Sequence, residues 1–96
     1  MAISIKKDTL LRRTDGSLAA DISDREIVIL SPDRANYFGT NEVSARIWKL
    51  LESYTSAEAI TSKLVEEYDV AEDECLTAVI VVLEEMTNEQ LVQVSV

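Results

Sequence analysis

Residues 34–48 read RANYFGTNEVSARIW, and within this stretch the chain changes from a strand-like to a helix-like pattern. Before Gly39, short runs of strand-forming residues alternate with turn-forming residues. From Thr40 onward, apolar residues recur every three or four positions, which is the spacing of an amphipathic helix. The stretch therefore separates an N-terminal β-rich half from a C-terminal helical half.

Three short strands are expected in the first half. Turn-forming residues separate them at 23–25 and 31–33, so the pattern predicts a three-stranded antiparallel meander. A segment within residues 3–13 can add a further strand. The three predicted strands are Leu18–Ile22, Glu26–Leu30 and Arg34–Phe38.

Helix starts are marked by capping residues in the second half. Thr40 or Asn41 can cap a helix over roughly 41–52. A capping box in which Thr55 pairs with Glu58 starts a second helix. A third helix follows a possible cap at 69–72.

The third helix is expected to run to about Met86, and residues 90–96 alternate polar and apolar as in a strand. The predicted fold is therefore α+β and winged helix-turn-helix-like. It is a three-stranded antiparallel meander followed by three helices and a short C-terminal strand.

Length and charge limit the classes of function. With 96 residues, we expect one domain spanning 1–96. The net charge is −9, and all of this excess falls in residues 49–96, because residues 1–48 carry equal numbers of acidic and basic side chains. Such a balance disfavours nucleic-acid binding, which depends on neutralising phosphates.

Residue types needed for common catalytic sites are missing. The chain has no histidine, Cys75 is its single cysteine, and the glycine-rich phosphate-binding motifs do not occur. We therefore expect no enzyme activity, no cofactor and no metal site, with Cys75 a small apolar residue of the third helix. Because no signal peptide or membrane-length apolar run is present, we expect a cytoplasmic protein.

Two segments have apolar surface or strand edges beyond what packing of the fold requires. Apolar residues of the third helix cover roughly 200° of its circumference, about twice the stripe of a surface helix. Either the helix lies between two layers, or the side with Cys75, Ala78 and Val82 is kept for a partner. Likewise, the strand Arg34–Phe38 either exposes an edge that can pair with a peptide or is covered by a terminal segment.

The runs at residues 29–48 and 64–86 resemble the PqqD-like family, whose members carry a similar "LSP…YF.LNEVGARIW" pattern followed by "L..EYDV…C..DV..FL..L". The resemblance covers roughly residues 26–92. Within that family, the chain is most similar to the stand-alone leader-binding proteins of lasso-peptide biosynthesis clusters. This sequence departs from the family pattern at Ala78, where family members frequently have aspartate, and at Val82, where they usually have phenylalanine.

The resemblance implies a RiPP recognition element, a non-catalytic adaptor that binds the leader of a ribosomally made precursor peptide. The leader would add as a strand beside the third strand of the meander and rest against the third helix. The adaptor would present it to a separate cysteine leader peptidase and indirectly serve the cyclase. The implied peptide-binding residues are Arg34, Ala35, Tyr37, Phe38, Cys75, Ala78, Val79, Val82 and Met86.

Two other readings stay open at the level of sequence. An acidic winged-helix transcription regulator or protein-interaction module would share the fold, although acidic residues flank the third helix where a DNA-reading helix is basic. An enzyme acting through Cys75 would need an unusual base in place of histidine.

Overall fold

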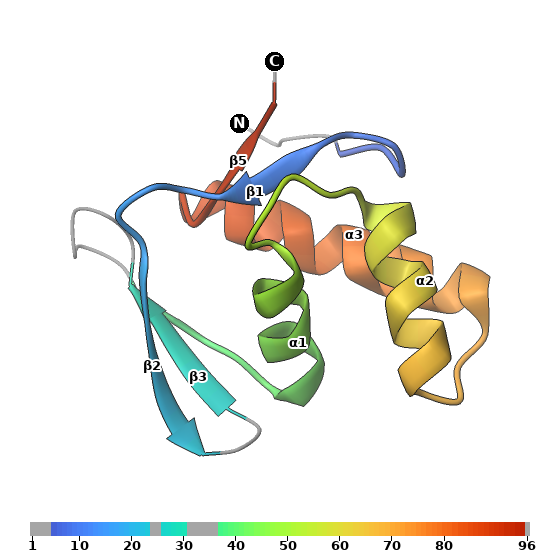
Figure 1. The fold of residues 1–96 in the computed structure, drawn as a ribbon, viewed down its shortest axis with the longest axis horizontal. Coiled ribbons are helices and arrows are strands. Elements are labelled where there is room, and N and C mark those ends of the chain that lie inside the picture. Colours follow the sequence, from blue (N-terminus) through green and yellow to red (C-terminus); the bar gives the residue numbers. More distant parts are fainter. Residues whose placement is uncertain (1–4, 24–25, 31–36, 96) are drawn as a thin grey trace.

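The computed structural model describes residues 5–23, 26–30 and 37–95, and for 21–23, 26 and 37 it describes the backbone only. In Figure 1 the helices occupy the centre and the right, one group of strands lies at the lower left, and a further pair of strands crosses above the helices. The predicted α+β order is confirmed, with one strand added before the meander. In chain order the elements are β1 (Leu11–Arg13), β2 (Leu18–Ser23), β3 (Glu26–Leu30), β4 (Tyr37–Gly39), α1 (Glu42–Leu50), α2 (Ala57–Glu67), α3 (Glu72–Asn88) and β5 (Val92–Val94).

The predicted meander is present as an antiparallel sheet in the order β2-β3-β4. Its last strand is described over Tyr37–Gly39, one residue beyond the predicted end at Phe38, and the predicted residues 34–36 lie outside the described part of the chain. One face of the sheet packs on α1 through Ile27 and Ile29, which are 4% and 0% exposed. The meander is thus attached to the helical half through the middle strand.

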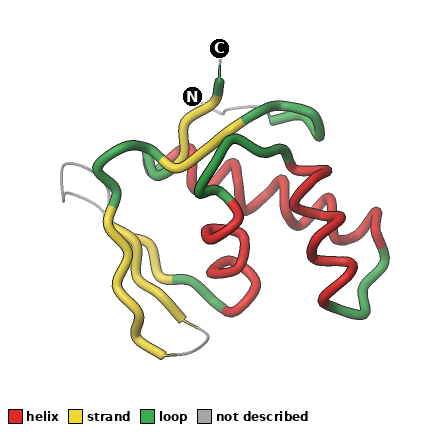
Figure 2. The backbone as a smooth tube through the Cα atoms, viewed as in Figure 1, coloured by secondary structure: helices red, strands yellow, loops and turns green. Residues whose placement is uncertain are grey.

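A second sheet joins the two ends of the chain. β1 pairs antiparallel with β5, with Leu11 opposite Val94, and this sheet is separate from the meander (Figure 2). The terminal strands therefore pair with each other and not with β4. This pairing answers one question left by the sequence, because neither β1 nor β5 covers the outer edge of the meander.

The capping predictions are partly confirmed. Asn41 caps α1, with its side-chain oxygen accepting a hydrogen bond from the Ser44 N–H at 2.8 Å. The cap of α2 is Ser56 instead of Thr55, because the Thr55 backbone is held in two hydrogen bonds with Leu11. No side chain caps α3, whose N-cap is Ala71.

All three helices and the strands β1, β3 and β5 contribute to one hydrophobic core. α3 packs against both α2 and β5. The most deeply buried large side chains are Leu11, Ile29, Ile47, Leu51, Ile60, Leu64, Leu83, Met86 and Leu91.

Thr40 links the end of β4 to the core, and its replacement tests this link. The buried Thr40 hydroxyl accepts a hydrogen bond from the Ile27 N–H at 3.1 Å and donates one to the Ile27 carbonyl at 2.9 Å. We expect Thr40→Val to lower the free energy of unfolding by about 2 kcal/mol, because the Ile27 N–H loses its partner in a dry environment. Thr40→Ser keeps the hydroxyl and is the control in urea denaturation. Equal losses in the two variants would contradict this role of the hydroxyl.

Candidate peptide-binding site

The outer edge of β4 presents backbone groups that the meander does not use. The Thr40 N–H donates to the Ile27 carbonyl at 3.1 Å, so these opposite residues form a hydrogen-bonded pair. Hydrogen-bonded and non-bonded pairs alternate along an antiparallel ladder. Phe38, opposite Ile29, therefore bonds to β3, whereas the backbone groups of Tyr37 and Gly39 point away from it.

The sheet face above Gly39 is sterically open. The residue is exposed, and a Cβ built on it would meet no heavy atom within 4 Å. β4 is also the terminal strand of its sheet, with no further strand beside it among the described residues. Among the described residues, the outer edge of β4 is therefore free to pair with an extended peptide, and the sheet face at Gly39 has room for a side chain of that peptide.

The wide apolar arc of α3 is divided between the core and the surface. Val79, Leu83 and Met86 are buried, with exposed fractions of 1% or less. Leu76 and Ile80 are partly buried beside them. On the other side of the helix, Ala78 is exposed and Val81 is 48% exposed, while Cys75 and Val82 are partly buried. We call the residues Cys75, Ala78, Val81 and Val82 the α3 strip.

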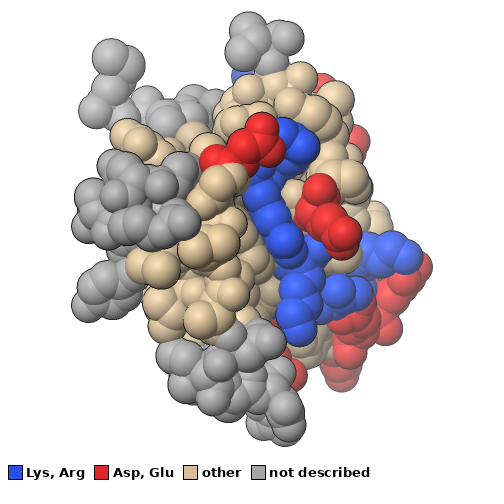
Figure 3. Space-filling model, turned by 60° about the vertical axis from the view of Figure 1, so that its left-hand side comes forward, with Lys and Arg blue, Asp and Glu red and all other residues tan. Residues whose placement is uncertain are grey.

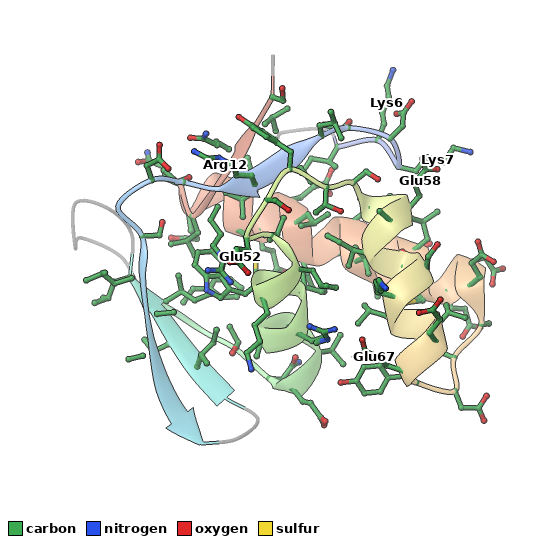
Figure 4. All side chains as sticks on the ribbon, viewed as in Figure 1. Lys6, Lys7, Arg12, Glu52, Glu58 and Glu67 are labelled. Atoms are coloured by element: carbon green, nitrogen blue, oxygen red, sulfur yellow. The ribbon has the colours of Figure 1, made fainter. Side chains whose placement is uncertain are left out.

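The N-terminal segment contacts α3 at Glu84. The Ile5 N–H donates to a Glu84 carboxylate oxygen at 3.2 Å, and Ile5 is 5% exposed. Glu84 follows Cys75 by nine residues, which is about half a turn round the helix. The segment also contacts the start of α2, where the Glu58 N–H donates to the Lys7 carbonyl at 3.0 Å (Figure 4). The contact at Glu84 therefore lies opposite Cys75 on the helix, but beside Val81, which precedes Glu84 by three residues.

The predicted site residues thus fall into three groups. Arg34 and Ala35 lie outside the described residues, and Tyr37 is described through its backbone in β4. Phe38 is partly buried and packs against the core. Of the helix residues, Cys75, Ala78 and Val82 retain accessible surface, whereas Val79 and Met86 belong to the core.

Two residues that matter for this surface were missed by the sequence reasoning. Gly39 contributes backbone groups and open space. A glycine directly after a predicted edge strand was the available sign that this position matters. Val81 lies outside the apolar arc that was assigned to the helix, yet it is one of the exposed large apolar side chains. An apolar residue outside the packing arc of a helix was the available signal for Val81.

The Cys75 thiol lies within the α3 strip. Burial raises its pKa, so at neutral pH it is the protonated thiol, which is a poor nucleophile. Within the described residues, no group of His, Cys, Asp and Glu side chains could hold a metal ion.

Basic side chains form a stripe on another face of the molecule, and acidic side chains lie on both sides of it (Figure 3). Several described basic residues are held by local contacts. Arg12 pairs with Asp15 at 2.7 Å, and Arg46 pairs with Glu67 at 2.7 Å. The Arg13 Nε donates to the Trp48 carbonyl at 2.9 Å, and partial burial lowers the Arg13 pKa. These arginines therefore have partners within the chain, whereas the basic residues of a nucleic-acid-binding face are free to neutralise phosphates.

Comparisons with known proteins agree with this architecture. A structure described as TbiB1 in complex with the TbiA(beta) leader peptide is 30% identical, with a TM-score of 0.76, over 85% of this chain and 94% of that one. The PqqD part of Methylobacterium extorquens PqqCD, described as a stand-alone RiPP recognition element, is 16% identical with a TM-score of 0.76, over 93% and 94% of the two chains.

A third structure, lasso peptide synthetase B1 complexed with the leader peptide, is 18% identical with a TM-score of 0.73, over 86% of this chain and 96% of that one. No curated protein matches the chain. Within its described part, no helix has the length and hydrophobicity needed to cross a membrane.

The chain shares its fold with the PqqD part of PqqCD and with two proteins solved as leader-peptide complexes, so its architecture is PqqD-like. The model of the family described as coenzyme PQQ synthesis protein D (PqqD) matches residues 26–92, so the chain belongs to the PqqD family.

Proposed function

We propose that this protein is a non-catalytic adaptor that binds the leader segment of a ribosomally synthesised precursor peptide by strand addition at the outer edge of β4. The observation that carries the proposal is the set of outward-pointing backbone groups at Tyr37 and Gly39 on an edge strand. Membership of the PqqD family supports it, as does the leader peptide bound to TbiB1. Pairing with a sheet edge is a common way to bind an extended peptide.

In this proposal the backbone of β4 supplies affinity and the α3 strip supplies an apolar anchor. The strip offers Ala78 and Val81 as exposed contacts, with Cys75 and Val82 partly exposed beside them. Arg34 and Ala35 belong to the same proposed strand interface. Acidic residues of α3, such as Glu74 and Glu85, are exposed near this apolar surface, so we expect a leader with a basic residue close to its apolar anchor.

The bound leader is presented to a separate cysteine leader peptidase, and the cyclase benefits indirectly. We place this step in the cytoplasm. The protonated state of Cys75 supports an adaptor role, because the chain has no histidine that could activate this thiol. The chemistry of maturation then belongs to the partner enzymes.

A titration with the fluorescently labelled leader of the neighbouring precursor gene tests the proposal. We expect fluorescence anisotropy to give a dissociation constant in the micromolar range or tighter, or about −8 kcal/mol. A leader with scrambled sequence is the control. Equal affinity for both peptides, or binding of neither, would refute leader recognition.

Ala78→Glu tests the helix side of the interface. Val82 packs partly against the core, whereas Ala78 is exposed, so the Ala78 variant perturbs the strip with less risk to folding. We expect about tenfold weaker leader binding, because a charge would be desolvated against an apolar anchor. Ala59→Glu adds the same charge at an exposed alanine of α2, outside the α3 strip, and should bind within about twofold of wild type. Equal affinities for the two variants would move the anchor away from the α3 strip.

A further inference from the structure

The described side chains on the face of the meander turned away from α1 are apolar. Ile27 and Ile29 point into the core, so Val28 and Leu30 lie on the opposite face of β3. The register sets Ala20 and Gly39 on either side of Val28, and Leu18 beside Leu30. None of these five residues is charged, and Leu18 is 50% exposed. Figure 3, turned to bring the strand side forward, shows uncharged surface beside the basic stripe.

Gly39 leaves this face incomplete at the edge. Val28 is partly exposed, and both of its cross-strand neighbours are small. A Cβ at Gly39 would meet nothing within 4 Å, so no side chain of the described residues fills the space above it. The vacancy lies on the strand that carries the proposed peptide-binding edge.

A strand added to that edge continues both faces of the sheet. Its residue beside Gly39 projects onto the same face as Val28, because paired residues on neighbouring strands point the same way. A long flat side chain at this position can pass over the glycine and reach the next strand, whereas a short aliphatic one cannot. Cross-strand aromatic residues are known to compensate for glycines in sheets in this manner.

We infer that Gly39 is a specificity-determining residue that selects a peptide with an aromatic side chain at the paired position, lying across Gly39 and against Val28. The inference rests on the proposed strand addition at β4. It adds a second apolar contact on the face opposite the core, separate from the anchor on the α3 strip. A charged side chain there is disfavoured, since the described side chains on this face offer it no partner.

A displayed library of random 12-residue peptides tests the inference without assuming a leader sequence. On the wild-type protein we expect the selected peptides to share an extended consensus with Phe, Tyr or Trp enriched about fivefold at one position. On Gly39→Val the branched side chain occupies the open space, so the aromatic enrichment should disappear at that position. Thermal unfolding checks that the variant is folded.

Ala20→Val is the matched control, because it makes a similar change on the same face, across Val28 from the edge. It should keep the aromatic preference. A wild-type consensus without a preferred aromatic position, or a preference that survives Gly39→Val, overturns the inference and leaves strand addition standing. If no consensus emerges, or if Gly39→Pro does not weaken binding of the selected peptides, both the inference and strand addition at β4 are refuted.

Discussion

Gly39→Pro is expected to weaken leader binding about 50-fold, while Gly39→Ala stays within about threefold of wild type. Proline removes the N–H of Gly39, which points to the outer side of the sheet, and its ring occupies the space that a paired strand must enter. A buried carbonyl of the leader would then lose its donor, which costs about 1–3 kcal/mol before the steric effect is added.

The fold should tolerate this proline. The Gly39 N–H does not serve the β3–β4 ladder, and Gly16, not Gly39, is the described glycine with positive φ. Phe38 already lies in a strand, as a residue before proline prefers. Anisotropy titrations and thermal unfolding of both variants are the measurements. If the proline variant is folded and binds like the alanine variant, the leader does not use the Gly39 N–H.

Leu83→Ala is expected to lower the free energy of unfolding by about 3 kcal/mol, and the melting temperature by roughly 15 °C. Leu83 is 0% exposed, in the middle of the core face of α3. Its truncation leaves a cavity where the helix meets the rest of the core, and the packed neighbours can close it only partly.

Val81→Ala is the control on the same helix. Val81 is 48% exposed, so its truncation should change stability by no more than about 0.5 kcal/mol. Urea denaturation followed by circular dichroism measures both variants. Similar losses for Leu83→Ala and Val81→Ala would mean that α3 is rotated about its axis relative to the orientation described.

Local patterns predicted the elements well, because the hydrophobic period and the turn residues are properties of neighbouring positions. Asn41 was recognised as a possible cap on this basis. Thr55 was not, in the end, the cap of α2, because its backbone pairs with Leu11, a contact between segments far apart in the sequence. The same limit applies to β1, whose partner β5 lies at the other end of the chain.

The binding surface was harder to predict than the fold. A helical projection shows how wide an apolar arc is, but not which part of it faces the core. Val79 and Met86 were therefore included with the peptide-binding residues, although both are buried. Gly39 has no side chain to attract notice, so its contribution became visible only through the ladder alternation and the open space beside it.

The pairing of β1 with β5 also has a practical consequence for protein engineering. Leu11 and Val94 are neighbours in this small sheet, which lies apart from the meander (Figure 1). A fluorescent probe attached at Leu10 or Ser95, two exposed residues joined by a backbone hydrogen bond of 2.8 Å, would therefore lie beside that small sheet and not beside β4.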